Sequence, residues 1–278
     1  MHSFLDLGLL NDVLDAFSSA TFVWIDTLFP IGRRLFFLLG SLELSWSGIR
    51  FALSNHEGGL FGFFELAVRK LLYLGFVYWL LEASPALLPM VISGFQQAGG
   101  QAAGITGLRP STFLATGVGI AGDYISQMNL LGLLIDPFAS SMAIVGLFMI
   151  VLSFAAMAAI LVITLVESYL AIGATFVLLA FAASRWTASI AQGALSNVLR
   201  IGVKLYVLYL VSGVVSGLVL QWAELVRSSD YFVGPLNLLT LVGTCLILAL
   251  LLWLIPSYAA RIVPPGLTLG LSPAVGDN

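Results

Sequence analysis

Residues 167–217 read ESYLAIGATFVLLAFAASRWTASIAQGALSNVLRIGVKLYVLYLVSGVVSG, and this stretch decides the fold. Two apolar segments flank a short polar patch, Ser184 to Asn197. An unpaired charge in hydrocarbon costs about 2.5–3.5 kcal/mol on insertion scales. Each charge at the junctions therefore needs an ionic partner, an aqueous cavity or the bilayer surface. The pattern predicts a membrane protein with charges at its junctions: Glu167, Arg185, Arg200 and Lys204.

The composition of the whole chain supports this fold class. Its 278 residues are 60% hydrophobic and only 9% charged, with a mean hydropathy of +1.05. A soluble domain carries about 25% charged residues because its surface must face water. We therefore expect an all-α, polytopic helical membrane protein with about five to six transmembrane segments plus amphipathic interfacial helices. The net charge of −3 lacks the basic footprint of nucleic-acid-binding proteins, and the single Cys245 excludes an intrachain disulfide framework.

The N-terminal region, residues 1–30, has the pattern of an amphipathic helix. Apolar side chains recur at helical spacing from Leu10 to Leu28, and polar residues such as Asp12 and Asp15 fall on the other side. All of its charges are negative, whereas the cytoplasmic leaflet attracts basic helices. We therefore expect this helix on the far side of the membrane or against a protein.

Residues 31–92 predict the first two transmembrane helices, over about 31–53 and 63–91, with Pro30 at the start of the first. Glu43 and Arg50 are seven residues apart on one helix face, which favours a structural Glu–Arg ion pair between packed helices. Residues 93–138 predict an extramembrane loop, rich in Gly, Ala and Gln over 93–112. A second amphipathic helix, about 114–128, should then lie in the membrane interface.

Residues 139–260 predict the remaining transmembrane bundle, and residues 261–278 a disordered tail. The expected apolar segments are 139–166, 169–183, 201–220 and 236–256, of which the second is barely long enough to cross. Segment 201–220 carries a GxxxG pattern, which lets two helices approach each other closely. It predicts a helix-packing or oligomer contact made by Gly213 and Gly217, with Ser212 and Ser216 at the same spacing.

Orientation follows from the enrichment of basic residues in cytoplasmic loops. If segment 169–183 dips in and returns without crossing, seven basic residues are cytoplasmic against four, with the N-terminus outside. Glu167 and Lys204 would then share the cytoplasmic face and could pair. Six crossings with the N-terminus inside give the same balance, but they place the acidic N-terminal helix against the anionic leaflet. We favour five crossings, and six remains open.

Catalytic patterns are weak in this sequence. Residues 117–122 match GxGxxG, but no βαβ unit surrounds them. A phosphate-binding GK[ST] loop is missing, and two His with one Cys cannot build a usual zinc site. We expect no enzymatic activity, no cofactor and no bound metal.

The order of soft patterns resembles one known family. ESYLAIGATFVLLAFAAS is followed by Arg185-Trp186-Thr187 and then by ALSNVLRIGVKLYVLYLVSG, and a Gly-rich loop leads into Arg109-Pro110-Ser111 and Gly117. This order, over roughly Leu35 to Pro256, is similar to that of the TrbL family. These proteins are polytopic inner-membrane subunits of conjugative type IV secretion systems, related to the equivalent VirB-type subunit.

The resemblance implies a channel or scaffold subunit in the bacterial inner membrane, with a periplasmic N-terminus and a role in conjugal DNA transfer and pilus-base assembly. Its implied partners are other type IV secretion subunits, separately encoded ATPases, the lipid bilayer, further copies of itself, and transferred DNA or protein in transient contact. The alternative is a membrane subunit of a small-molecule permease or transporter. Transporters usually contain paired broken helices in two repeated halves, and no such repeat is visible.

Overall fold

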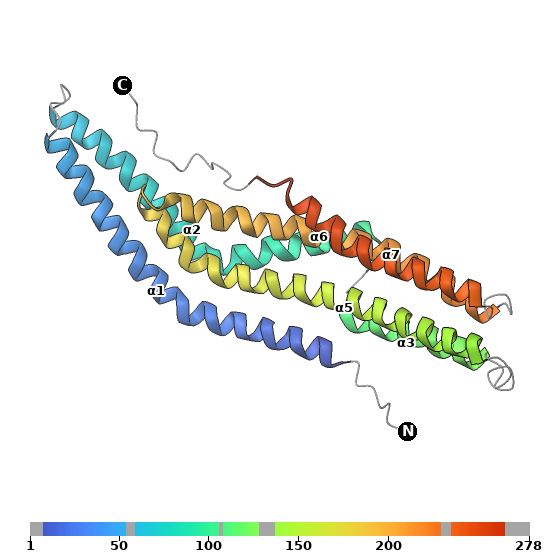
Figure 1. Ribbon diagram of the computed structural model, residues 1–278. Helices are drawn as coiled ribbons and strands as arrows, with labels where there is room; N and C mark the ends of the chain where they lie inside the picture. Colours follow the sequence, from blue (N-terminus) through green and yellow to red (C-terminus); the bar gives the residue numbers. More distant parts are fainter. Residues whose placement is uncertain (1–7, 54–58, 106–107, 128–136, 229–234, 265–278) are drawn as a thin grey trace. The chain divides into compact units, whose positions relative to one another are not determined.

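The computed structural model describes residues 8–53, 59–105, 108–127, 137–228 and 235–264. All regular secondary structure in these ranges is helical, which confirms the predicted all-α class. Figure 1 shows the elements in chain order: α1 (Leu9–Leu53), α2 (Gly59–Ala102), α3 (Pro110–Gln127), α5 (Pro137–Leu179), the 3₁₀ helix η1 (Ala180–Ala183), α6 (Ala188–Ser228) and α7 (Pro235–Ala260).

Four of the described helices are long and apolar enough to cross a membrane, as judged by length and composition. An α-helix needs about 20 mostly apolar residues to do so. The protein is therefore a polytopic membrane protein, as the sequence predicts. The four stretches are Phe61–Ala102, Ser140–Ala183, Ala188–Trp222 and Asn237–Ala260.

The chain forms two compact units, and the first comprises Met1–Ala16, Gly94–Val166 and Val203–Ala260. In this unit α3 packs so closely on α5 that a Cβ at Gly117 would lie 2.5 Å from the Cβ of Phe154. A hydrogen bond of 2.9 Å from the side-chain amide of Asn11 to the Ser111 hydroxyl joins the start of α1 to α3. The core of the unit is apolar, with Phe154, Leu161 and Leu252 fully buried.

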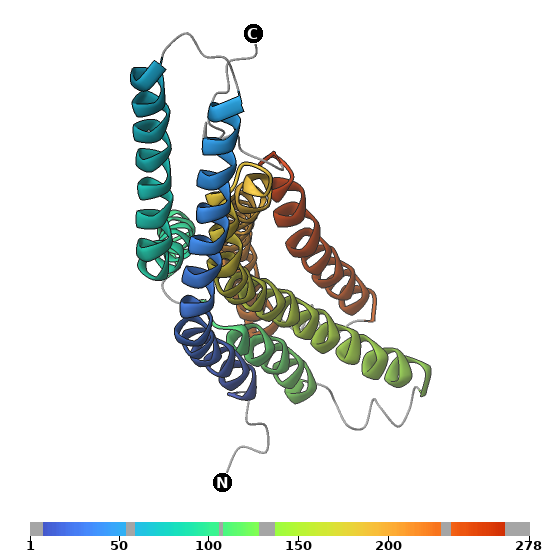
Figure 2. The same ribbon diagram turned by 90° about the vertical axis from the view of Figure 1, so that its left-hand side faces the viewer.

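The second unit comprises Phe17–Ser93, Glu167–Gly202 and Arg261–Asn278. Here α1 and α2 run side by side, as both ribbon views show (Figures 1 and 2). The end of α5, η1 and the start of α6 form a helical hairpin that packs on them. Its core consists of large side chains from α1 and α2 and small ones from the hairpin: Phe36, Leu74, Val77, Leu81, Leu179, Ala180, Ala182, Ala183 and Ala191.

Three predicted element boundaries differ from the structure, and the first is at Pro30. The predicted amphipathic helix and the first predicted span form the single helix α1, with Pro30 inside it. Proline removes one backbone hydrogen bond from a helix interior, but the flanking turns can continue when tertiary contacts hold them.

The second difference is the predicted loop over 93–112, which is wrong for residues 93–102 because α2 continues to Ala102. The helix ends where Gly104 adopts a left-handed conformation, with φ of +68°. The Ile105 amide donates to the Gly100 carbonyl, and the Gly104 amide donates to the Gln101 carbonyl. This pair of bonds is a Schellman motif, which terminates a helix by satisfying its last carbonyl groups.

The third difference concerns the predicted segments 139–166 and 169–183. Residues 139–179 lie in one continuous helix, α5, and residues 180–183 form η1 directly after it, so the chain does not fold back at Glu167. The break occurs later, at Ser184, whose backbone is extended with φ of −121° and ψ of 136°. The second amphipathic helix is present as α3, the last predicted span lies within α7, and the predicted tail lies outside the described residues from position 265 onward.

Candidate functional site: a buried charged cluster

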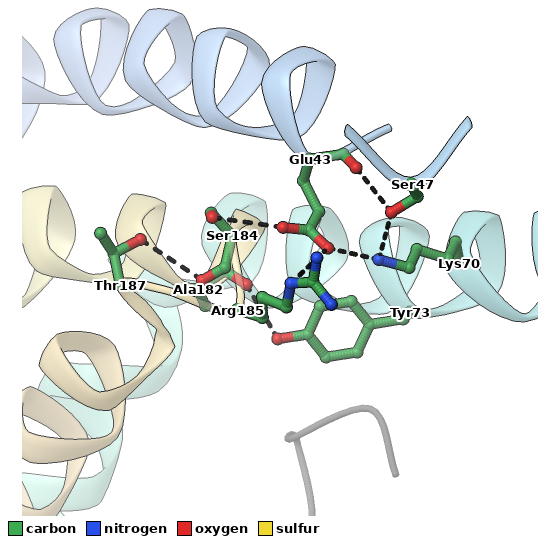
Figure 3. Close-up of polar contacts among 8 residues, drawn as sticks. All are labelled: Glu43, Ser47, Lys70, Tyr73, Ala182, Ser184, Arg185 and Thr187. Atoms are coloured by element: carbon green, nitrogen blue, oxygen red, sulfur yellow. Dashed lines mark hydrogen bonds and ion pairs between the residues drawn. The ribbon is translucent and has the colours of Figure 1, made fainter. Parts of the chain in front are cut away.

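A buried carboxylate lies at the meeting point of three elements of the second unit. Glu43 projects from α1, and its side chain is only 4% exposed. Lys70 reaches it from α2, and Arg185 reaches it from the connection between η1 and α6 (Figure 3). These three side chains form what we name the Glu43 cluster. It joins the α1–α2 pair to the α5–α6 hairpin.

The ammonium of Lys70 is the primary partner of Glu43. It forms an ion pair with Oε1 and also donates a hydrogen bond of 2.6 Å to the Ser47 hydroxyl. Ser47 lies one turn after Glu43 and donates to the backbone carbonyl of Glu43 at 2.7 Å. Lys70 is thus fixed by two groups of the same α1 turn, which holds α1 and α2 in one register.

The α5–α6 hairpin makes weaker contacts with the same carboxylate. Nε of Arg185 lies 3.7 Å from Oε1 of Glu43, and the Ser184 hydroxyl donates to Oε2 at 3.4 Å. Two cations therefore share one carboxylate, and the cluster has a formal charge of +1. Removing one partner of a buried ion pair typically costs about 3–5 kcal/mol because the other charge remains uncompensated.

The turn between η1 and α6 satisfies its own carbonyl groups with side chains. Thr187 Oγ1 donates to the Phe181 carbonyl at 2.6 Å, and the Tyr73 hydroxyl donates to the Ala182 carbonyl at 2.8 Å. The Thr187 amide donates to the Ser184 carbonyl at 3.1 Å. The last carbonyls of a helix need such partners, above all in a membrane protein, where water is scarce.

Two tryptophans lie at the surface beside the cluster. Trp46 of α1 and Trp186 of the turn pack edge to face, with ring centroids 5.6 Å apart. The guanidinium carbon of Arg185 is 5.6 Å from the centroid of the Trp186 ring, within the range of a cation–π interaction. Both indoles remain exposed, so one side of the Arg185 side chain is bordered by open aromatic surface.

The structure brings together two of the six charges singled out in the sequence, Glu43 and Arg185. Arg50 is exposed in the last turn of α1 and is not the partner of Glu43. Arg200 is half-buried and donates to the Val263 carbonyl at 3.3 Å. Glu167 in α5 and Lys204 in α6 are each half-buried, and their pairing stays a prediction.

Sequence reasoning missed Lys70 as the partner of Glu43, although one signal could have identified it. Position 56 is the centre of the segment that joins α1 to α2. Glu43 precedes it by thirteen residues and Lys70 follows it by fourteen, a separation of 27 in all. Residues nearly equidistant from the turn of a helical hairpin lie opposite each other, since both helices rise by the same amount per residue.

The small residues of α6 have different surroundings, although all belong to one pattern. A Cβ at Gly213 would lie 2.6 Å from the Cβ of Ala103, so α6 approaches the end of α2 closely there. A Cβ at Gly217 would meet no atom within 4 Å. Ser212 is fully buried and Ser216 half-buried. Gly213 therefore serves packing within the chain, and Gly217 faces open space.

The part of the chain that the structure describes contains no group of three or more His, Cys, Asp or Glu side chains that could hold a metal ion. The polar groups that gather in the second unit are instead the charges, hydroxyls and carbonyls of the Glu43 cluster and its turn. This arrangement can hold helices in register or bind an anion.

Comparison with known proteins gives consistent matches. The sequence model of one family, described as TrbL/VirB6 plasmid conjugal transfer protein, matches residues 41–255. The chain is 26% identical over 255 residues to a probable conjugal transfer protein TrbL of Sinorhizobium fredii, covering 91% of this chain and 63% of that protein. It is 25% identical over 214 residues to a conjugal transfer protein TrbL of Rhizobium radiobacter, covering 77% of this chain and 53% of that protein.

This chain thus spans less than two thirds of the length of these two relatives. No solved structure matches it. The family match begins two residues before Glu43 and ends within α7, so it includes the Glu43 cluster and all or nearly all of the four apolar stretches long enough to cross a membrane.

Proposed function

Because this chain belongs to the TrbL/VirB6 family of plasmid conjugal transfer proteins, we propose that it is a membrane subunit of a conjugal type IV secretion system. The observation that carries the proposal is the family match over residues 41–255. In this role the protein contributes to the channel or scaffold at the base of the transfer apparatus and assists pilus-base assembly. It acts as a transfer component rather than as an enzyme.

The architecture supports a scaffold that holds several helices in a fixed arrangement. The Glu43 cluster ties α1, α2 and the α5–α6 hairpin together through ionic and hydroxyl contacts. Such contacts are directional, so they fix helix register in surroundings where apolar packing alone is less selective. The large exposed apolar side chains on α1, α2, α5 and α7 leave surface for lipid and for neighbouring subunits.

We place the protein in the bacterial inner membrane with a periplasmic N-terminus. The acidic start of α1 supports this orientation, because Asp12 and Asp15 are poorly suited to an anionic cytoplasmic leaflet. Its partners would be other secretion subunits, separately encoded ATPases and further copies of itself, with the transferred DNA or protein in transient contact.

A mating experiment tests the role. The coding sequence is deleted in the donor, and plasmid transfer per donor cell is measured with and without the wild-type gene supplied in trans. We expect transfer to be lost on deletion and restored by the wild-type gene, while donor growth is unchanged. Microscopic counts of pili in the same strains separate a defect in pilus-base assembly from a defect in passage alone.

Normal transfer by the deletion strain would contradict the proposed function. A deletion that impaired growth on particular small solutes, with transfer intact, would instead favour the permease alternative.

A further inference from the structure

The Glu43 cluster contains one more cation than anion, and Arg185 is the cation farther from the Glu43 carboxylate. We propose that Arg185, with Trp46 and Trp186 beside it, binds the phosphate group of an anionic phospholipid at the membrane surface. Such a lipid site would not depend on the role of the protein in conjugation.

The charge balance is the first argument. The cluster contains two cations and one carboxylate, and Lys70 takes the closer position on that carboxylate. Two groups on α1, the Glu43 carboxylate and the Ser47 hydroxyl, already hold the Lys70 ammonium. Arg185 is only at ion-pair distance, 3.7 Å, and its side chain remains 19% exposed. The surplus positive charge of the cluster therefore lies on Arg185, the member that is partly exposed and can be reached by an external anion.

Unused hydrogen-bond donors are the second argument. A guanidinium carries five N–H donors in a planar fork that matches two oxygens of a phosphate. Among the described residues, the Arg185 guanidinium donates no hydrogen bond, and its buried Nε is without an acceptor. Because Nε is buried against Glu43, a phosphate would accept from the two terminal NH₂ groups, which lie in the exposed part of the side chain.

The surroundings favour a lipid over other carriers of phosphate. Trp186 is 54% exposed, Trp46 43% and Ile190 43%, so the surface around Arg185 is apolar and aromatic. Tryptophan is enriched at the membrane–water interface, where its ring contacts the boundary between headgroups and acyl chains. A nucleic acid is instead bound by several basic side chains that neutralise several phosphates. One arginine over the Trp186 ring, which itself packs on Trp46, fits a single headgroup with its acyl chains against the indoles.

The test measures lipid binding to the full chain in detergent. Dioctanoyl phosphatidylglycerol is titrated into the purified protein, and native mass spectrometry counts the lipids retained. Arg185→Gln should weaken the tightest binding about tenfold, as expected for the loss of a charge-assisted contact. Arg185→Lys should lie in between, because it keeps the charge and loses the fork. Arg50→Gln is the matched control and should bind like wild type, since Arg50 is an exposed arginine outside the cluster.

Competition identifies the source of the phosphate. Excess inorganic phosphate and a single-stranded oligonucleotide should each fail to displace the lipid, and displacement by either would overturn the lipid assignment. Equal binding by Arg185→Gln and Arg50→Gln would overturn the site itself. If Arg185→Gln fails to fold, Trp186→Leu serves as the second variant. It keeps the guanidinium and should also weaken binding, so wild-type binding by this variant would again overturn the site.

Discussion

The ammonium of Lys70 on α2 forms an ion pair with the buried carboxylate of Glu43 on α1, and the two residues are 27 positions apart in the chain. The pair lies where the α5–α6 hairpin meets both helices, because Ser184 and Arg185 contact the same carboxylate. Because one carboxylate serves all of these contacts, we expect the stability of this junction to depend on the charge of Glu43.

Replacing Glu43 by Gln should destabilise the fold strongly. The substitution leaves Lys70 and Arg185 without a counter-charge in a largely buried site, and breaking a buried pair in this way costs about 3–5 kcal/mol. Thermal unfolding in one detergent measures the loss. Glu65→Gln is the matched control, since Glu65 pairs with Arg69 on the exposed surface of α2 and such pairs contribute only about 0.2–1 kcal/mol. Equal unfolding temperatures for the two variants would contradict the importance of the cluster.

The double variant Glu43→Gln/Lys70→Met should be more stable than Glu43→Gln alone. Removing both charges abolishes the uncompensated ammonium, so the two effects should be non-additive, as they are for residues in direct contact. The same unfolding measurement on the wild type, Glu43→Gln, Lys70→Met and the double variant gives the coupling free energy between the two residues. Effects that simply add would show that Lys70 and Glu43 act independently.

The two glycines of the GxxxG pattern should respond differently to Ile. Gly213→Ile forces a side chain into Ala103 and should cost about 1–3 kcal/mol of stability by overpacking. Gly217→Ile meets open space, so the chain should insert and fold normally. If Gly217 lies in a contact between subunits, Gly217→Ile should fold normally as a single chain but should weaken the assembled complex on a native gel. Intact assembly by Gly217→Ile would remove Gly217 from the oligomer interface.

Thr187→Val should weaken the turn between η1 and α6. The variant removes the hydroxyl donor and leaves the Phe181 carbonyl with only the long bond from the Ser184 amide, so we expect a loss of about 0.5–1.5 kcal/mol. Thr27→Val is the matched control, because Thr27 donates to the Val23 carbonyl on an exposed part of α1. We expect a lower unfolding temperature for Thr187→Val only. A comparable loss in both variants would attribute the effect to threonine replacement in general.

Cysteines introduced at Ser19 and Gln101 test the orientation of the chain. Both side chains are exposed, and the native Cys245 is buried and should react slowly. If the N-terminus is periplasmic, both new cysteines should react with a membrane-impermeant thiol reagent in intact cells. Labelling that appears only after lysis would reverse the orientation.

Much of the fold could be predicted from the sequence because helices that cross a membrane must be long and apolar, and both properties can be read from composition. Apolar length identified helices in the regions of α2, α5, α6 and α7, and the period of apolar residues identified α3. The limits of helices were less predictable. Gly99 and Gly100 disfavour a helix by propensity, yet both lie in α2, where contacts with Tyr206 and Tyr209 of α6 favour glycine.

The charged cluster was only partly visible for a different reason. The energetic cost of Glu43 in an apolar helix required a cation, but the sequence alone did not specify which one. Arg50 shares a helix face with Glu43, whereas Lys70 and Arg185 reach it through the fold of a hairpin and a later turn. Hydroxyl contacts such as that of Tyr73 with the Ala182 carbonyl depend on atomic packing, for which no sequence period exists.

The spacing of the Glu43 cluster along the chain also orders events during synthesis. At 5–20 residues per second, Lys70 leaves the ribosome roughly 1–5 s after Glu43, whereas Arg185 follows Glu43 by roughly 7–28 s. The first two helices can thus enter the bilayer with the acidic side chain already neutralised by its neighbour. When Arg185 is synthesised, the Glu43 carboxylate is already paired with Lys70. The α5–α6 hairpin can then pack on the first two helices without having to neutralise an unpaired carboxylate.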